Sequence, residues 1–460
     1  MRLHYLSIWL GALLLSMPLF AQTNYVLTTS SPSTVLDTCG RHGLTVVATG
    51  WTNGVSGVYL VSSPTNVDPA TIEYGDPTIA NFEANQPVAM PELSGATAAQ
   101  LSQSVTPILE SLSTRFPIFY FGSIVPSNYL IQPAIRIVRL HEMRFATGLT
   151  GSGLTIAVID TGVDPKHPAL SSVLTTGFDF TRNQPGVPSE LADLAPALQP
   201  GLTQSVTPIL ESQTVVPVNN STLAILDQSV TPILEGTLPQ AFGHGTMTAG
   251  LAHLVAPRAR IMPLKAFHAD GTSDVFSIIQ AIYYAADHGA NVISMSFEVG
   301  QPSNALIAAI KYAQNKNVIL VASAGNDSSG ASVFPAGANR VFGIGSTTNS
   351  DVASTFSNFG SPDVLFAAPG EGVITTYPGG NYAAGWGTSF SAPMVAGSVA
   401  LALQSNSGAS ACGVANALAR AVPVPLMGKG RVDFYQALTQ RIPSGGCDTA
   451  FSFGSTVDDD

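Results

Sequence analysis

Charged residues are scarce in this chain, and basic residues are the scarcer kind. Of 460 residues, 18 are Lys or Arg and 29 are Asp or Glu, which gives a formal net charge of -11. This balance argues against a nucleic-acid partner, because nucleic-acid-binding proteins carry a basic surface. Only 10% of residues are charged whereas 45% are apolar, which argues against disorder overall. A surface rich in Ser, Thr, Asn and Gly indicates a protein that works outside the cell.

Cysteine is also scarce. The chain has 3 cysteines, which are too few for a disulfide scaffold. Cys412 and Cys447 lie close enough along the chain to pair in an oxidising compartment, whereas Cys39 stands alone. The sequence leaves this pairing open.

Apolar runs of membrane-spanning length are absent. The longest run covers residues 6–20, follows Arg2 and ends before the small residue Ala21. This is the pattern of a signal peptide over residues 1–21, and the run is short for a spanning helix. An uncleaved anchor is the alternative. We therefore expect a secreted, periplasmic or extracellular protein with no membrane contact after removal of the signal.

Strand-like and helix-like segments alternate from residue 154 onward. Short apolar runs predict buried strands, and apolar residues at helical spacing predict helices. The expected strands cover residues 154–159, 291–297, 318–322, 340–345 and 364–368, and the expected helices cover 273–288, 304–314 and 388–403. This alternation predicts an α/β fold with a doubly wound, mostly parallel sheet and helices on both faces. Active sites in such folds gather at the C-terminal ends of the strands.

The composition divides the chain into further parts. Strand candidates at 24–29, 44–49 and 57–62 and a helix near 33–41 predict a small α+β domain ahead of the α/β domain. The expected parts are a signal peptide 1–21, the α+β domain 22–85, a linker 86–128, the main domain 129–440 with an insertion at about 180–240, and a C-terminal tail 441–460.

One octapeptide occurs three times without change. The sequence Gln-Ser-Val-Thr-Pro-Ile-Leu-Glu begins at residues 103, 204 and 228. The unequal spacing excludes a solenoid, which needs a fixed period. The simpler explanation is a duplicated insertion tolerated in surface loops, and the alternative is a repeated cleavage or docking element.

Three polar residues have the side chains that acyl transfer needs. Asp160 follows an apolar run, His244 lies between two glycines, and Ser389 opens the longest expected helix. Each alone has a structural explanation, such as a helix cap for Asp160 or Ser389. Together they supply an orienting acid, a base and a nucleophile, in the chain order Asp, His, Ser that is one known solution.

At these residues the sequence resembles the subtilisin-like serine proteases, or subtilases. The segments Asp-Thr-Gly at 160–162, His-Gly-Thr at 244–246 and Gly-Thr-Ser at 387–389 match the three signature segments of that family. The resemblance covers roughly residues 148–438. It implies a subtilisin-like fold and a serine endopeptidase that acts on polypeptides.

The resemblance also implies a role for each site residue. Asp160 would orient His244, which would take the proton from Ser389 and return it to the leaving amine. Ser-Ala-Gly-Asn at 323–326 matches the oxyanion segment, so the Asn326 amide would donate to the oxyanion; a turn residue is the alternative. The substrate would lie extended between two strand edges, with Gly325 facing the primary specificity pocket. One edge is formed by Ser273, Asp274 and Val275, and the other by Ser296, Phe297 and Glu298.

The sequence also departs from the family. Glu298 stands where relatives usually carry glycine, and it either selects a basic or polar residue ahead of the scissile bond or points outward into solvent. Ala169 stands where several relatives carry an aspartate that ligates calcium, so that site is not carried over. No cofactor is expected, and calcium elsewhere is left open. Met247 replaces a second histidine of the His motif.

The domain at 22–85 resembles the propeptide of many subtilases. It would aid folding and inhibit the enzyme until it is removed, with self-cleavage somewhere between residues 73 and 128. These patterns predict a secreted serine endopeptidase that is made as a precursor and acts through an acyl-enzyme. The alternative is an esterase-like or narrow processing hydrolase that uses the same triad.

Overall fold

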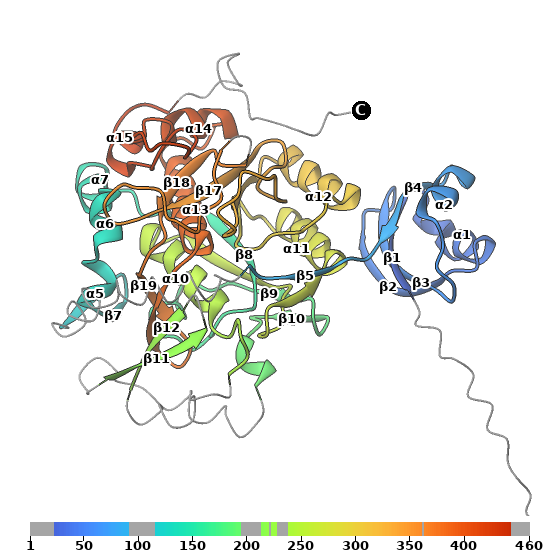
Figure 1. Ribbon diagram of the computed structural model, residues 1–460, viewed down its shortest axis with the longest axis horizontal. Helices are drawn as coiled ribbons and strands as arrows, with labels where there is room; N and C mark the ends of the chain where they lie inside the picture. The colour runs from blue at the N-terminus through green and yellow to red at the C-terminus, as the bar shows by residue number, and fades with distance from the viewer. Residues whose placement is uncertain are drawn as a thin grey trace, which may run out of the picture. The chain divides into compact units, whose positions relative to one another are not determined.

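The computed structural model describes residues 23–91, 116–194, 238–360 and 363–442, together with the backbone of 213–219 and 222–227 (Figure 1). The chain divides into two compact units, Met1–Ala84 and Asn85–Asp460. The expected signal peptide, all three octapeptide copies and Cys447 lie outside the described residues, as does most of the expected tail.

The first unit is a four-stranded antiparallel sheet with two α-helices, in the strand order β2-β3-β1-β4. Its elements are β1 (Thr23–Thr29), α1 (Val35–Arg41), β2 (Thr45–Thr52), β3 (Gly57–Ser63), α2 (Pro69–Gly75) and β4 (Ile79–Ala84). The rings of Tyr25 and Phe82 stack with centroids 4.8 Å apart, which joins β1 to β4 in the core. The sequence predicts neither α2 nor β4, because both are short and only partly buried.

An eight-stranded sheet forms the centre of the second unit, in the order β10-β9-β13-β8-β15-β16-β17-β18. β10 runs antiparallel to β9, and the other neighbours are parallel. The strands are β8 (Thr155–Asp160), β9 (Gly177–Asp179), β10 (Gln184–Gly186), β13 (Arg260–Lys265), β15 (Val292–Met295), β16 (Ile319–Ser323), β17 (Val341–Thr347) and β18 (Phe366–Pro369). Every residue of β15, β16 and β17 is buried. Because successive side chains point to opposite faces, both faces of the sheet are covered, and the mostly parallel α/β architecture is confirmed.

Helices of the second unit pack in pairs around this sheet, α10 with α13 and α11 with α12 (Figure 1). The helices are α5 (Ser127–Leu130), α6 (Pro133–Ile137), α7 (Leu140–Thr147), α10 (His244–Val255), α11 (Val275–Asp287), α12 (Asn304–Asn315), α13 (Thr388–Ser405), α14 (Ala411–Leu418) and α15 (Phe434–Leu438). Gly397 permits the close approach of α13 to α10, since a Cβ there would lie 2.7 Å from the Cβ of Val255. α13 is buried from its first residue onward, so its N-terminus lies among protein atoms.

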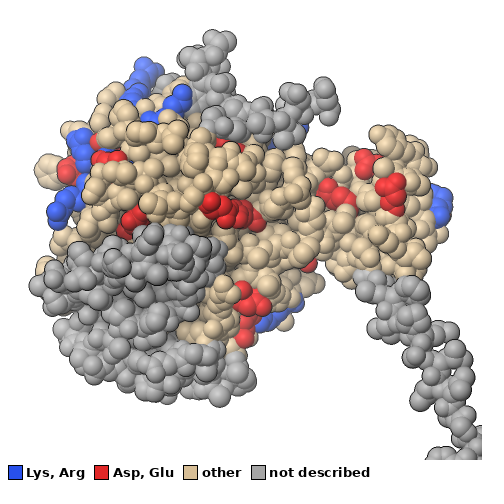
Figure 2. Space-filling model, viewed as in Figure 1, with Lys and Arg blue, Asp and Glu red and all other residues tan. Residues whose placement is uncertain are grey.

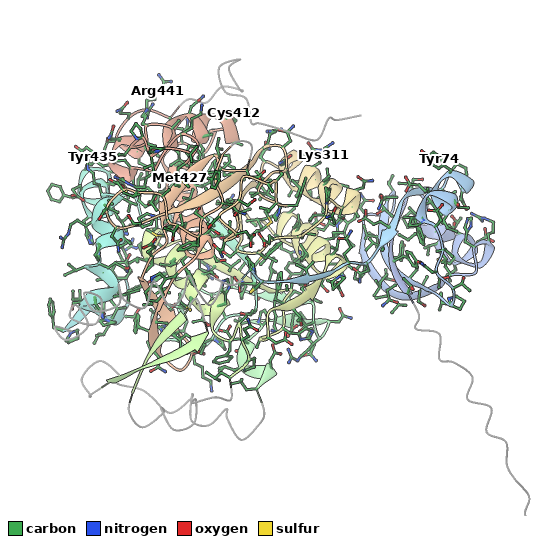
Figure 3. The ribbon with its side chains drawn as sticks, viewed as in Figure 1. Tyr74, Lys311, Cys412, Met427, Tyr435 and Arg441 are labelled. Carbon is green, nitrogen blue, oxygen red and sulfur yellow. The ribbon has the colours of Figure 1, made fainter. Side chains whose placement is uncertain are left out.

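Uncharged side chains dominate the face of the protein drawn in Figure 2, as the low content of charged residues leads one to expect. A small apolar cluster surrounds Met427 (Figure 3) and includes Val364 and Ala324. Because Ala324 follows β16 directly, this cluster supports the loop that leaves the C-terminal end of that strand. Within the described ranges, no helix has the length and apolar character needed to cross a membrane.

The segment 86–128, expected to be a linker, contains three strands. These are β5 (Pro87–Ala89), β6 (Pro117–Tyr120) and β7 (Ser123–Pro126). β5 pairs antiparallel with β14 (Thr272–Asp274), and β6 pairs with β7 as a hairpin. The sequence does not predict these strands because they are too short to show the alternation of apolar and polar residues that identifies a strand.

The expected insertion at about 180–240 is partly built into sheets. Besides β10 it contains a short 3-10 helix, η3 (Glu190–Asp193), and the strands β11 (Gln213–Asn219) and β12 (Thr222–Asp227). β12 pairs with β20 (Asn381–Gly385), which pairs with β19 (Val373–Tyr377), and the result is a second, four-stranded sheet.

Candidate active site

Asp160 is the last residue of β8, at the C-terminal end of the central sheet. The apolar run before it forms the buried strand, and the side chain itself is almost fully buried. Its carboxylate accepts hydrogen bonds from the Thr161 backbone N–H at 2.7 Å and from the Thr248 hydroxyl at 3.0 Å. These donors compensate the cost of burying a charge and fix the orientation of the carboxylate.

His244 is the first residue of α10 and contacts Asp160. Its Nδ1 lies 2.8 and 3.0 Å from the two carboxylate oxygens of Asp160. The flanking glycines are required here, because Gly243 has a φ of 91° and a Cβ on Gly245 would lie 2.0 Å from the Gly162 carbonyl oxygen. The His–Gly–Thr segment therefore brings the imidazole against the end of β8.

Ser389 lies in the first turn of α13. Its Oγ is 3.4 Å from the carbonyl oxygen of Ser296, and its own carbonyl accepts a hydrogen bond from the Ser296 hydroxyl at 2.9 Å. The ring of the next residue, Phe390, lies 5.6 Å from the imidazole of His244 between centroids. The three candidate residues thus come from the end of β8 and the first turns of α10 and α13, in one region of the second unit.

Asn326 follows β16 and is tied to the start of α13. Its Oδ1 accepts hydrogen bonds from the Thr388 N–H at 2.9 Å and from the Thr388 hydroxyl at 3.0 Å. These two hydrogen bonds fix the orientation of the amide, so that Nδ2 is the atom available as a donor. Nδ2 donates to the carbonyl oxygen of Pro91 at 3.4 Å, so Asn326 already presents a donor to a carbonyl group.

That carbonyl belongs to a segment of the chain that lies along β14. β5 pairs antiparallel with β14, with Val88 opposite Ser273, and Met90 N–H donates to the Gly271 carbonyl at 3.0 Å. The next predicted residue, Val275, donates its N–H to the Gln86 carbonyl at 3.0 Å. The strand edge that the sequence predicts for substrate is thus paired with the chain's own residues 86–90.

The side chains at this edge have structural roles. The Asp274 carboxylate caps α11 by accepting from the Ser277 N–H at 2.8 Å, and Val275 is buried in the core. Phe297, on the other predicted edge, is also buried and packs on Phe267 with centroids 5.0 Å apart. Because their side chains are buried, Val275 and Phe297 can contact a peptide only through their backbone.

Glu298 and Gly325 are close together. A Cβ on Gly325 would lie 2.6 Å from Oε2 of Glu298, so this carboxylate points across to the loop after β16. Burial, with a smaller contribution from the charge of Asp327, raises the pKa of Glu298 to about 7. The side chain does not point outward into solvent, which was the alternative that the sequence left open.

Glu190 supports the site and is not indicated by any sequence motif. This fully buried carboxylate accepts from the Thr161 hydroxyl at 2.7 Å, from the Gly243 N–H at 3.1 Å, and from the Thr246 hydroxyl. Its donors are the residue after the candidate aspartate and two neighbours of the candidate histidine. Burial raises the pKa of Glu190 to about 7. Since its donors lie in other segments, only the fold reveals its role.

Ala169, where relatives carry a calcium ligand, is fully buried and packs in the main apolar cluster. Its methyl group offers no oxygen to a cation, so the residue does not fit that site. Over the described parts of the chain, no group of three or more His, Cys, Asp or Glu side chains is arranged to hold a metal ion.

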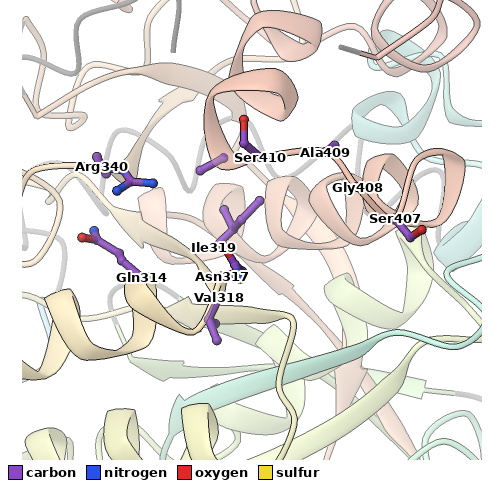
Figure 4. A pocket seen from close by; sticks show the side chains of 10 residues that line it. Gln314, Asn317, Val318, Ile319, Arg340, Ser407, Gly408, Ala409 and Ser410 are labelled. Atoms are coloured by element: carbon purple, nitrogen blue, oxygen red, sulfur yellow. The ribbon is translucent and has the colours of Figure 1, made fainter. Parts of the chain in front are cut away.

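A separate cavity of about 300 Å³ lies away from these residues (Figure 4). None of the candidate site residues lines it. Its lining comes from the end of α12, the segments before β16 and β17, and the connection from α13 to α14: Gln314, Asn317, Val318, Ile319, Arg340, Ser407, Gly408, Ala409, Ser410 and Ala411.

Comparisons with known proteins identify the family. The family model Peptidase S8, the subtilase family, matches residues 151–454. Thermitase of Thermoactinomyces vulgaris is 30% identical over 303 residues, which cover 63% of this chain and 89% of thermitase. Subtilisin Savinase of Lederbergia lenta is 31% identical over 259 residues, which cover 56% of this chain and 79% of that protein.

A solved structure agrees at the level of the fold. The crystal structure of fervidolysin from Fervidobacterium pennivorans, a keratinolytic enzyme related to subtilisin, has a TM-score of 0.65 and 19% sequence identity; the match covers 93% of this chain and 62% of that one. The family match, the named relatives and the arrangement of β8, α10 and α13 lead to one conclusion: this chain belongs to the subtilase family and is a subtilisin-like serine endopeptidase.

Proposed function

We propose that the enzyme hydrolyses peptide bonds through Asp160, His244 and Ser389, with Asn326 as an oxyanion donor and an acyl-enzyme as intermediate. The observation that carries this proposal is the position of Pro91. Its carbonyl accepts from Asn326 Nδ2, while the residues before it pair with β14 as an extended peptide would. The carbonyl that would be attacked is therefore next to the start of α13.

The proton path follows from the contact between His244 and Asp160. A carboxylate within 3.0 Å of Nδ1 favours the ring proton on Nδ1 and makes Nε2 the ring atom that accepts a proton. His244 then takes the Ser389 hydroxyl proton as Oγ attacks the substrate carbonyl. The same proton passes to the leaving amine, and water repeats the sequence to release the acyl group.

The developing oxyanion would receive two hydrogen bonds. One donor is the Asn326 Nδ2, whose orientation is fixed by the two hydrogen bonds to Thr388. The other is the Ser389 N–H, because the first N–H groups of a helix have no partner within the helix. The α13 dipole adds to this stabilisation.

The first unit and the segment after it would form a propeptide that inhibits the enzyme. The unit ends at Ala84, and the chain continues directly into the residues that pair with β14. Self-cleavage would fall at a bond between residues 73 and 128. An S389A precursor, purified alone, is expected to stay intact; its processing at this bond would refute self-cleavage.

We further propose that the enzyme is exported, with residues 1–21 as its signal peptide, and that it acts on polypeptides outside the cytoplasm. The compartment is tested by expressing the full chain and sequencing the N-terminus of the exported protein. The expected first residue of the exported precursor is Gln22, whereas retention of Met1 would favour an uncleaved anchor.

The catalytic proposal is tested by hydrolysis of a denatured protein substrate. The wild-type enzyme should cleave it, and H244A should be slower by about a thousandfold or more, as expected for loss of a triad member. Equal activity of H244A would show that another base acts. An esterase-like hydrolase, the second candidate, would cleave esters but not amides when the two substrates share the same side chain.

A further inference from the structure

Two buried polar atoms in the segments beside the candidate nucleophile lack partners. Oε2 of Glu298 and Nδ2 of Asn358 are both buried, and neither has a hydrogen-bond partner among the described residues. A Cβ on Gly325 would lie 2.6 Å from the first atom and 2.4 Å from the second. The two atoms therefore face the same space against Gly325, where any larger residue at position 325 would collide with both.

The orientation of the Asn358 amide is fixed by the fold. Its Oδ1 accepts hydrogen bonds from the Asp327 N–H at 2.9 Å and from the Ser329 N–H at 3.0 Å. Nδ2 must then point in the other direction, toward Gly325. The amide is a donor built into the wall of this space.

The space adjoins the reacting groups on two sides. Gly325 precedes Asn326, and its N–H donates to the Thr388 hydroxyl at 3.2 Å, next to Ser389. Glu298 follows β15 by three residues, and Ser296 in the same segment contacts Ser389. A substrate carbonyl at Asn326 would therefore direct the side chain of its own residue toward Glu298.

Burying these atoms without partners carries a cost that a ligand can relieve. Buried donors and acceptors in folded proteins are nearly always paired, and an unpaired carboxylate costs more than a neutral group. Burial raises the pKa of Glu298 to about 7, which is the direction expected for a carboxylate without a cation beside it. A cationic side chain supplies both the charge and the hydrogen bonds that Oε2 lacks.

We propose that Glu298, supported by Asn358, forms the floor of the pocket for the residue that precedes the scissile bond, and that it selects Lys or Arg there. This inference rests on the proposed function, because it places the scissile carbonyl at Asn326. The substrate class is thus polypeptides cut after a basic residue.

Residues 86–91 of the chain itself carry no basic side chain at the position that precedes the scissile bond. Pro91 occupies it, and a proline ring has neither a cation nor a donor for Glu298. Proline also lacks the N–H that other residues could donate at this point of the peptide. A segment of this kind suits an inhibitor that is released slowly better than a substrate.

The test uses mature enzyme and peptide amides that differ only in the residue before the scissile bond: Lys, Arg, Gln, Phe, Ala or Pro. For the wild type we expect kcat/KM for Lys and Arg to exceed that for Gln by about tenfold to a hundredfold, the range of a charge-assisted hydrogen bond. In E298Q, which keeps the shape and removes the charge, this ratio should fall to near one. E298G should lose the preference in the same way.

Other outcomes overturn the inference. Equal cleavage after Lys and Gln by the wild type, cleavage only after Ala or Pro, or a Lys preference that persists in both variants would each do so. Labelling of Ser389 by an uncharged phosphonate, run on each protein, separates this failure from failure of the proposed function. An enzyme that is labelled but has no preference refutes the pocket alone, whereas absence of label and of all cleavage refutes the proposed function.

Discussion

Replacement of Asp160 by asparagine should slow the enzyme without unfolding it. The amide is isosteric with the carboxylate, and its oxygen can keep the 2.7 Å hydrogen bond from the Thr161 N–H. What is lost is the negative charge next to His244 Nδ1. In the proposed mechanism, that charge matters most when the imidazole becomes positive, as it takes the proton of Ser389.

The size of the effect follows from the geometry. With roughly 4 Å between the centres of the two charges and an effective dielectric constant of about 20, the attraction is about 4 kcal/mol. A loss of that size in the transition state corresponds to about a thousandfold in kcat. If the amide also turns its N–H toward Nδ1, the ring adopts the wrong tautomer, and the loss approaches about 10,000-fold.

The assay measures kcat with a peptide amide, using variants matured by immobilised wild-type enzyme that is then removed. Thr248→Val is the matched control, because it deletes the 3.0 Å hydrogen bond to the same carboxylate and keeps the charge. The control should lose no more than about tenfold. If D160N stayed within tenfold of the wild type, or lost no more than T248V, the role assigned to Asp160 would be wrong.

Three further predictions concern packing, the oxyanion and pH. G245A should lose about 1–3 kcal/mol of unfolding free energy, because its Cβ would lie 2.0 Å from the Gly162 carbonyl oxygen. Equal denaturant midpoints for G245A and the wild type would contradict the close packing. N326A should lower kcat by about a hundredfold to a thousandfold and leave KM nearly unchanged, which is the loss measured when subtilisin is deprived of one oxyanion donor. An unchanged kcat would show that Asn326 has no part in the mechanism. Burial and the charge of Asp327 raise the pKa of Glu298 to about 7, so this carboxyl group is neutral below that pH and charged above it. The ratio of kcat/KM for Lys substrates to that for Gln substrates should therefore rise from pH 6 to pH 8. Titration of His244 changes kcat/KM for both substrates in the same way and therefore cancels in the ratio. A ratio that does not change with pH would contradict the role of Glu298.

The parts of this fold that the sequence predicts are those whose residues are buried continuously. The apolar run ending at residue 159 becomes β8, and the runs near 292 and 319 become β15 and β16, each within a few residues of the expected bounds. Central parallel strands are buried on both faces, so they read as unbroken apolar runs. The helix expected from residue 388 is found as α13, with Ser389 in its first turn.

Short strands that pair with distant segments could not be predicted. β5 has three residues and meets β14 from far along the chain, and β12 completes a sheet with β20. Neither strand carries a pattern of its own, because its stability comes from a partner strand that the local sequence does not specify. The same holds for Glu190, whose three donors are defined only by the folded structure.

The side chain of Glu298 illustrates a third limit. Its position beside the primary pocket follows from the family resemblance, but its direction depends on the space that Gly325 leaves and on the fixed amide of Asn358. A carboxylate is ordinarily solvated, so sequence reasoning favours the outward orientation. The structure turns it inward.

Covalent labelling tests the central claim most directly. The mature enzyme is incubated with an uncharged phosphonate, digested and examined by mass spectrometry, beside the H244A variant. The account predicts one label per molecule on Ser389 and a greatly reduced rate of labelling in H244A. Label on Ser391 or on any other serine, or an equal rate in H244A, would contradict it.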